Sequence, residues 1–466
     1  MSTNTGFSKT DTKTWIKWLA IIGVPILIYL LPTGEVFTHP IKLFFVITVF
    51  GILTFVLEPF DYAIGSLLMM SFYILSGLST MDVVFKPFTQ NIPWMVYGCL
   101  LLINIIQNRT RIIERIACFC MIKTGGTYNG IIYGLIILGI IINIVVPGVF
   151  TSMAVCVLAY GICEALNLGK SRASSGIMLA AIVGFIEAWT FVFCPPDLGV
   201  LIGIASAATP MTMDYFTYFK HCLVFVPFPF LMGFMITKLC KPETAINGKA
   251  YFMERQKELG QLTKQEKRVI AVLIVFVLYL FTAQWHKLDM MWGFLFAPLA
   301  LFMPGLQVGE KEDIKGVNFP MIMFVVGCMS IGGVAAQVGV AQMISDAAMP
   351  LLVGRSNTFF VLFTFFFVAV FNFVMTPMAL MAAFSVPLSQ IALDMGMSPL
   401  PMLYAFSRGC YSVLLPYEAV IIAAAFAFGN TKMECFLKVF GVKLLLTAVW
   451  ILLIACPYWS MLGLMG

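Results

Sequence analysis

Long apolar stretches recur along this chain, and few charges interrupt them. A helix needs about 20 apolar residues to cross the roughly 30 Å hydrocarbon core of a bilayer. Hydrophobic residues make up 61% of the 466 and charged residues only 11%, whereas a soluble domain carries about 25% charged residues. Lipid must therefore cover most of the surface, and the pattern predicts an all-α, polytopic membrane protein. The stretches that predict complete spans are 15–33, 41–57, 62–80, 89–107, 215–239, 268–285, 289–304, 316–336 and 433–456.

Two further apolar regions are interrupted by proline, glycine, serine and threonine. They cover residues 128–208 and 357–428. Irregular backbone at membrane depth is tolerated only where it faces protein or a water-filled cavity. Paired interruptions of this kind are typical of the binding site of a secondary transporter. We therefore predict about eleven transmembrane helices in total, with two re-entrant hairpins and two broken helices.

The loop charges predict the orientation. Eight lysines and arginines lie between residues 238 and 268, and basic loops are typically cytoplasmic. Counting spans from this loop places the N-terminus in the cytoplasm and the C-terminus outside, as expected for a multi-pass protein of the cell (inner) membrane. Residues 108–123 alternate basic and apolar side chains with helical spacing, which predicts a helix lying on the cytoplasmic surface. The net charge of +6 reflects this topology and does not suggest a nucleic-acid partner.

An internal repeat relates the two halves of the chain. Residues 184–188 align with 405–409 at an offset of 221, and the same offset aligns Pro195-Pro196-Asp197 with Pro416-Tyr417-Glu418. Upstream, the segment that begins at Asn143 resembles the segment that begins at Asn372. The copies cover roughly 41–239 and 268–456. Each copy contains an odd number of complete spans, so the second is expected to be inverted.

Proline removes a backbone donor and clashes with the preceding turn, so Pro195-Pro196 and Pro416 are expected to split their helices. Half-helix N-termini attract anions, and C-termini or free carbonyls attract cations. The sequence therefore predicts one central site for a small charged solute and its coupling ion. Four ionisable residues lie near the two breaks, and charges at that depth are usually functional. They are Glu187, Asp197, Arg408 and Glu418.

The four charges suggest different roles. Arg408 is interpreted as the counter-charge of an anion, and Asp197, Glu418 and Glu187 as candidates for holding the coupling cation. The alternative for Asp197 and Glu418 is that they cap the second half-helices. Glu187 and Arg408 occupy equivalent positions with opposite sign and could instead form an ion pair. Further candidates for substrate binding flank the proline breaks, although helix packing is the alternative for the hydroxyl side chains. They are Pro147, Thr151, Ser152, Pro196, Thr376, Pro377 and Tyr417.

Several motifs carry a resemblance to a known family. Gly327-Cys328-Met329-Ser330-Ile331-Gly332-Gly333 leads to a hairpin that ends at Val386-Pro387-Leu388, and Leu415-Pro416-Tyr417-Glu418 opens a half-helix. In the first half, Cys194-Pro195-Pro196-Asp197 matches more weakly. With these motifs the chain resembles the divalent anion/sodium symporter (solute carrier 13-like) family of the ion transporter superfamily. It lacks the family's Ser-Asn-Thr motifs, since Pro147-Gly148-Val149 and Pro377-Met378-Ala379 stand at those positions.

The resemblance implies a scaffold domain, a mobile transport domain, elevator-type movement, a homodimer and sodium-coupled uptake of dicarboxylates, tricarboxylates or sulfate. The expected units are an N-terminal tail with the first helix (1–40), a first scaffold half with the interfacial helix (41–127), a first transport half (128–239), a cytoplasmic linker (240–267), a second scaffold half (268–356) and a second transport half (357–466).

The leading hypothesis is a secondary active transporter of a small organic anion, coupled to Na⁺ or H⁺. The runner-up keeps the fold but carries a cationic or zwitterionic solute, or exchanges ions. A non-transport membrane subunit is a weaker alternative, because it would not need two breaks in matching positions. The sequence contains no nucleophile motif of the Gly-x-Ser-x-Gly type and no helix-borne His-x-x-x-His, so no enzymatic activity, cofactor or bound metal is expected.

Overall fold

The structure is a computed structural model of the chain. It describes residues 12–57, 59–145, 147–340, 343–344, 346, 350, 354–373 and 375–466, and at residues 12–14, 149–151, 284, 417, 420, 421, 424 and 427 it describes the backbone alone. The secondary structure of these residues is helical, apart from one isolated β-bridge between Thr127 and Asn247. The all-α prediction is therefore confirmed.

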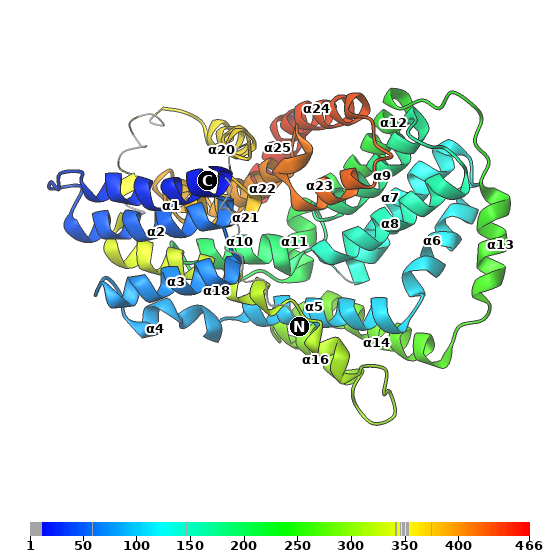
Figure 1. Ribbon diagram of the computed structural model, residues 1–466, viewed down its shortest axis with the longest axis horizontal. Helices are drawn as coiled ribbons and strands as arrows, with labels where there is room; N and C mark the ends of the chain where they lie inside the picture. The colour runs from blue at the N-terminus through cyan, green and yellow to red at the C-terminus, as the bar shows by residue number, and fades with distance from the viewer. Residues whose placement is uncertain are drawn as a thin grey trace, which may run out of the picture.

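The first half of the chain begins with peripheral helices and continues into a hairpin and a broken helix (Figure 1). Its helices are α1 (Thr12–Tyr29), α2 (His39–Leu57), α3 (Tyr62–Leu75), α4 (Met81–Val84), η1 (Lys86–Thr89), α5 (Asn91–Arg109), α6 (Ile112–Lys123), α7 (Tyr128–Val145), α8 (Val149–Ala165), α9 (Arg172–Ala188), η2 (Pro195–Gly199), α10 (Val200–Ala205), α11 (Tyr215–Cys222), η3 (Leu223–Phe225) and α12 (Phe228–Leu239).

The second half follows a linker helix and also contains a hairpin and a broken helix. Its helices are α13 (Lys249–Leu259), α14 (Lys264–Phe281), α15 (Ala283–His286), α16 (Met290–Ala300), α17 (Lys311–Lys315), α18 (Phe319–Val338), α20 (Asn357–Phe371), α21 (Pro377–Asp394), α22 (Pro399–Cys410), η4 (Pro416–Glu418), α23 (Val420–Ala427), α24 (Met433–Trp450), η5 (Ile451–Ala455) and α25 (Cys456–Met461).

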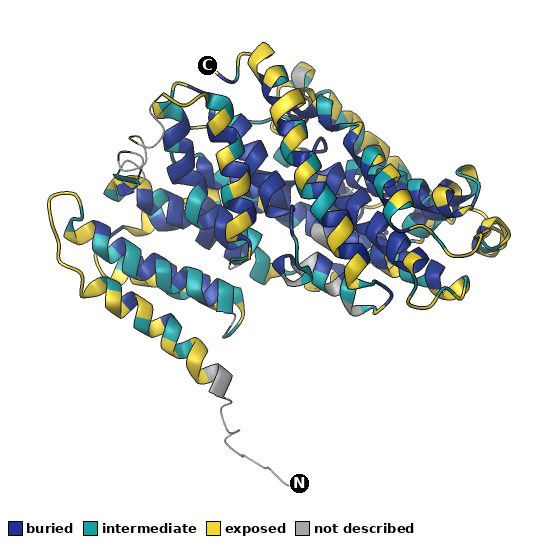
Figure 2. Cartoon of the chain, turned by 90° about the horizontal axis from the view of Figure 1, so that it is seen from above, coloured by how far each residue is buried: buried dark blue, intermediate teal, exposed yellow. Residues whose placement is uncertain are grey.

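Several helices have the length and apolar character needed to cross a membrane. Within the described ranges these are α2, α7, α18, α21 and the continuous segment Met433–Met461, and the pair formed by 215–225 and Phe228–Leu239, bent by 40°, makes a sixth. Six shorter apolar helices accompany them. Figure 2 shows α1 at the periphery with much of its surface exposed, and its exposed side chains include Leu19 and Leu27. Such a surface suits lipid contact, whereas the count of eleven spans stays a prediction.

Both predicted helix breaks are present. The helix α9 ends at Ala188 and helical structure resumes at Pro195, while α22 ends at Cys410 and helical structure resumes at Pro416. The prolines therefore begin the second half-helices, and the breaks are the non-helical residues that precede them. Proline suits the first helical position, because its missing N–H would have no intrahelical partner there.

The two hairpins, α7–α8 and α20–α21, open at opposite ends of the molecule. The base of α7–α8 lies beside the turn before α24, where the Asn430 amide donates to the carboxylate of Glu164, at the end of α8, at 3.3 Å. The base of α20–α21 lies beside the C-terminus, where the Ser398 N–H donates to the Leu464 carbonyl at 3.2 Å. The intervening segment Met433–Met461 has 29 residues, or about 43 Å of helix. The inverted repeat itself stays a prediction.

Each hairpin also packs against the broken helix of the other half: α8 contacts α23, and α21 contacts α10. Within the first half, α7 and α9 approach closely at two glycines. A Cβ atom on Gly184 would lie 2.6 Å from the Cα of Ile136, and one on Gly139 would lie 2.6 Å from the carbonyl carbon of Gly184. The hairpin is therefore held against the broken helix by direct contact of the two backbones.

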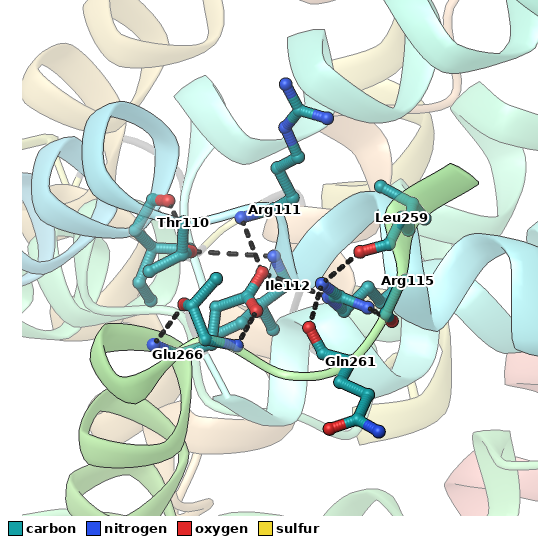
Figure 3. Close-up of polar contacts among 10 residues, drawn as sticks. Thr110, Arg111, Ile112, Arg115, Leu259, Gln261 and Glu266 are labelled. Atoms are coloured by element: carbon teal, nitrogen blue, oxygen red, sulfur yellow. Dashed lines mark hydrogen bonds and ion pairs between the residues drawn. The ribbon is translucent and has the colours of Figure 1, made fainter. Parts of the chain in front are cut away.

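The loops at one end of the molecule form a charged face, which we call the linker face because it carries residues 240–263. Figure 3 shows Arg115 of α6 donating to the carbonyls of Leu259 and Gln261, and its Nε lies 3.0 Å from the Glu266 carboxylate. On the same face Arg109 lies 3.0 Å from Asp313. Burial alone would raise the pKa of Asp313, but the Glu310 N–H and the Arg109 guanidinium outweigh it and hold that pKa below its usual range.

The close approach of α7 and α9 generates a prediction. Substituting Gly184→Ala places a methyl group against backbone that cannot rotate away, so the helices must separate, at a cost of about 1–3 kcal/mol. Thermal unfolding of the purified protein should show a lower melting temperature. The matched control is Gly161→Ala in α8, where a Cβ would meet no atom within 4 Å and helix propensity favours alanine by about 1 kcal/mol. Equal melting temperatures for the two variants would contradict the close packing.

Candidate functional site

The two broken helices meet in the interior through hydrogen bonds at Asp197. This residue lies in η2, directly after the first break, and is 1% exposed. Its Oδ2 accepts a hydrogen bond from Ser407 Oγ at 3.0 Å, and its Oδ1 accepts one from the Tyr411 hydroxyl at 2.8 Å. Ser407 and Tyr411 belong to the end of α22 and the second break, so one carboxylate joins the two halves of the chain.

Arg408, the residue after Ser407, extends into the first break. Its Nη2 donates to the Thr190 carbonyl at 3.1 Å and to the Tyr218 hydroxyl at 3.2 Å. The guanidinium lies over the Phe225 ring, 5.1 Å from the centroid, a favourable cation–π geometry. The side chain is 6% exposed, and its Nε is buried with no hydrogen-bond partner among the described residues. One N–H of a buried cation is therefore left to bind another group.

Glu187 forms a buried ion pair with Lys443 of α24. Their side-chain atoms approach to 2.9 Å, and each side chain is 3% exposed. Lys443 Nζ also donates to the Tyr411 carbonyl at 2.7 Å. The sequence repeat suggested an ion pair between Glu187 and Arg408, but the structure gives these two residues different partners. Equivalent positions in two halves need not touch, and each of these side chains finds its partner on a terminal helix of the opposite half.

Glu418 lies at the start of the second half-helix and binds backbone groups. Its Oε1 accepts the Leu414 N–H at 3.0 Å and also the Leu415 N–H, and its Oε2 lies 3.5 Å from the Asn372 amide nitrogen. These contacts are those of a helix cap, which was the alternative considered for this residue. Asp197 differs, because its described partners are side-chain hydroxyls of the other half.

In each half of the chain, one asparagine joins the hairpin to the first part of the broken helix. Asn143 of α7 donates to the Phe185 carbonyl at 3.2 Å and accepts the Trp189 indole N–H at 2.7 Å. Asn372, at the end of α20, donates to the Cys410 carbonyl at 3.0 Å. In the sequence, these residues were identified only as the first residues of two similar segments. Their shared role is to satisfy carbonyl groups near the end of a half-helix, which otherwise have no helical partner.

The remaining candidates lie near the hairpin tips and breaks, but the described contacts do not bring them to Arg408. Pro147 is buried at the tip of the first hairpin, Pro196 is buried in η2 and Ser152 is buried in α8. Thr376 caps α21 by accepting the Ala379 N–H at 3.4 Å, and Pro377 begins that helix. The side chains of Thr151 and Tyr417 fall outside the described part of the structure.

The most informative residue that sequence reasoning missed is Lys443. The apolar stretch 433–456 contains two lysines, Lys438 and Lys443, and Lys443 is the one further from the start of the helix. A charge at that depth is costly and would have been sufficient signal. The roles of Ser407, Tyr411 and Tyr218 could not have been found in this way, because hydroxyl side chains are common in membrane helices.

A cavity of about 750 Å³ opens between α6, α8 and α13. Arg111, Glu114 and Arg255 supply its charged lining, and Met153 and Val157 of α8 supply part of its apolar lining. Because α8 begins at the tip of the first hairpin, the cavity extends from the linker face along that hairpin arm.

Two broken helices joined by buried charges, within a bundle of apolar helices, are characteristic of a membrane transporter. The family described as "Sodium:sulfate symporter transmembrane region" matches residues 12–465, so the chain belongs to this family and the expected divalent anion/sodium symporter relationship is confirmed. No curated protein matches the chain.

The fold has a counterpart among solved structures. The crystal structure of the Alcanivorax borkumensis YdaH transporter is similar with a TM-score of 0.56 and 11% sequence identity, over 97% of this chain and 99% of that one. A likeness at this identity shows the fold alone.

The cap formed by Glu418 generates a second prediction. Glu418→Gln keeps the oxygen that accepts the Leu414 and Leu415 N–H groups, so its melting temperature should stay near that of the unmodified protein. Glu418→Leu leaves both N–H groups without this acceptor, at about 1–3 kcal/mol for each buried group, and should melt lower. The control is Glu434→Gln, since Glu434 is 55% exposed. If Glu418→Gln kept its stability but lost transport, the residue would act in coupling and not as a cap.

Proposed function

We propose that this protein is a secondary active transporter that moves a small organic anion, such as a dicarboxylate, across the membrane in symport with Na⁺ or H⁺. Membership of a family of sodium:sulfate symporters supports a small anion as the transported solute. The observation that carries the proposal is the buried Arg408 at the meeting point of the two broken helices, with an Nε–H that has no partner within the described ranges.

Arg408 supports anion binding for a physical reason. A buried cation is costly unless it is paired, and one unsatisfied N–H adds a further penalty. Charge-assisted hydrogen bonds to a carboxylate or sulfate oxygen would offset both costs. Thr190 and Tyr218 both accept hydrogen bonds from Nη2, so the guanidinium is held in place before a ligand arrives.

Asp197 is the carboxylate that we propose for coupling. Of the three buried acids near the helix breaks, Glu187 is paired with Lys443 and Glu418 accepts backbone N–H groups. Asp197 accepts two hydroxyl groups, each of which can rotate to accept a hydrogen bond in turn. Protonation of this carboxyl therefore needs no rearrangement of the backbone. Since its two partners come from the opposite half, a change in its charge would act on the contact between the halves.

Elevator-type movement is proposed from the family resemblance and is supported by the packing. Residues 128–239 and 357–466 are joined by the bonds at Asp197, by Arg408 and by the contact of Ser174 with Asn430, which favours their movement as one body. A homodimer would supply the fixed scaffold that such movement needs.

The second candidate function keeps the fold but carries a cationic or zwitterionic solute, or exchanges ions. The observation that favours it is the balance of buried charge at the site. Three acids, Glu187, Asp197 and Glu418, face two bases, Arg408 and Lys443. A site that is acidic overall suits a positive group on the solute.

Ligand-induced stabilisation of the purified protein tests the proposal. A ligand at 100 times its Kd stabilises the folded state by about 2.7 kcal/mol, so succinate, citrate or sulfate should raise the melting temperature. Arg408→Gln should reduce this stabilisation to about 0.4–1.4 kcal/mol at the same solute concentration, because loss of a charged hydrogen bond weakens binding by roughly 10- to 100-fold. The control is Arg172→Gln, since Arg172 carries the same charge and is 50% exposed.

The result that would overturn the anion proposal is stabilisation by cationic or zwitterionic solutes and by none of the anions. The same set of solutes can then be tested for uptake into proteoliposomes, with and without a gradient of Na⁺ or H⁺. An anion that binds in an Arg408-dependent way but does not accumulate under either gradient would contradict symport.

A further inference from the structure

The two helix breaks expose backbone carbonyls at equivalent positions. Thr190 follows the end of α9 and Tyr411 follows the end of α22. Their residue numbers differ by 221 (411 − 190), the separation that also relates Pro195 to Pro416. Carbonyls at the C-terminal end of a half-helix carry partial negative charge, and in transporters built from broken helices such carbonyls coordinate the coupling cation.

In this chain each of the two carbonyls already accepts a hydrogen bond from a buried basic side chain. Arg408 Nη2 lies 3.1 Å from the Thr190 oxygen, and Lys443 Nζ lies 2.7 Å from the Tyr411 oxygen. Arg408 is 6% exposed and Lys443 is 2% exposed. The two bases come from different positions of the repeat, since Arg408 belongs to α22 and Lys443 to α24. The two equivalent carbonyls thus accept hydrogen bonds from basic residues that are not themselves equivalent in the repeat.

The Lys443 ammonium contacts two oxygens of the kind that could also bind a metal cation. It contacts a carboxylate oxygen of Glu187 at 2.9 Å and the carbonyl oxygen of Tyr411. These are hard oxygen donors of the kind that s-block cations prefer. While the ammonium is present, a second cation at the same oxygens is excluded by space and by repulsion between like charges a few ångströms apart.

We propose that Lys443 and Arg408 act as fixed cations at the two breaks, in the place where a coupled carrier would bind sodium, so that this protein binds its anion without requiring Na⁺. The inference rests on the proposed function for the identity of the solute, but the occupation of the carbonyls does not depend on it. Of the two coupling ions named above, it leaves H⁺, with Asp197 as the carboxyl available to bind it.

The test begins with the unmodified protein. Its thermal unfolding is measured without solute in NaCl, KCl and N-methylglucamine chloride at equal ionic strength. The expected melting temperatures are equal, because the Thr190 and Tyr411 carbonyls and the Glu187 carboxylate already have basic partners. A saturable rise that is specific to Na⁺ would overturn the proposal.

Three variants then test whether Lys443 is the reason that Na⁺ does not change the melting temperature. Lys443→Met removes the ammonium and leaves the Glu187 carboxylate and the Tyr411 carbonyl without it, so this variant should melt lower than the unmodified protein in KCl and regain stability with Na⁺ in a saturable manner. Glu187→Gln combined with Lys443→Met removes the anionic donor as well and should show no Na⁺ response. The control is Lys438→Met, on the same helix but with a side chain that is 51% exposed.

The outcomes separate the possible roles of Lys443. If Lys443→Met were destabilised without any Na⁺-specific recovery, the lysine would be only a structural cap and ion-pair partner, and the proposal would fail. If that variant could not be purified, the double variant and the salt comparison on the unmodified protein would still decide the matter. If the melting temperature did not depend on Na⁺ and no anion bound, the proposed function would be contradicted. The proposal that Lys443 and Arg408 act as fixed cations would still stand.

Discussion

The hydrogen bonds that join the two broken helices are the interaction on which the rest of the interior depends. Ending a helix within a membrane leaves carbonyl and N–H groups without partners, and each such group is costly away from water. This chain satisfies those groups with ionisable side chains. Arg408 and Lys443, from other helices, bind carbonyls, and Glu418, at the start of the second half-helix itself, binds N–H groups. The charges in turn need partners, and Glu187 and Tyr218 supply them. Breaks and charges therefore stabilise each other.

The same logic explains the position of the hairpins. Asn143 and Asn372 join a hairpin arm to a carbonyl near the end of a half-helix, so each hairpin is fixed to the broken helix of its own half. The second arm of each hairpin then packs against the broken helix of the other half. The close backbone contact at Gly139 and Gly184 sets the distance at which these bonds can form. A shift of either hairpin would act directly on the buried charges.

Much of this architecture could be predicted from the sequence, because the signals are local. Apolar length predicted the membrane helices, and Pro195 and Pro416 predicted the breaks within a few residues. The partners of the charges could not be predicted in the same way. Glu187 and Arg408 are equivalent in the repeat, yet Glu187 pairs with Lys443, 256 residues further along the chain (443 − 187). Long-range pairs of this kind depend on how the two halves pack, which no local pattern records. Glu418 was identifiable as either a cap or a coupling residue, and only its contacts with Leu414 and Leu415 favour the cap.

The central claim is that the positive charges needed at the helix breaks are supplied by Arg408 and Lys443 and not by bound Na⁺. Calorimetric titration of the transported anion into the purified protein, repeated over a range of Na⁺ concentrations at constant ionic strength, tests it most directly. Binding of one ligand that requires another must strengthen as the second is added, by thermodynamic linkage. The account predicts an anion Kd that does not change with Na⁺ concentration. A Kd that falls about tenfold for each tenfold rise in Na⁺, as coupled binding of one ion requires, would contradict it.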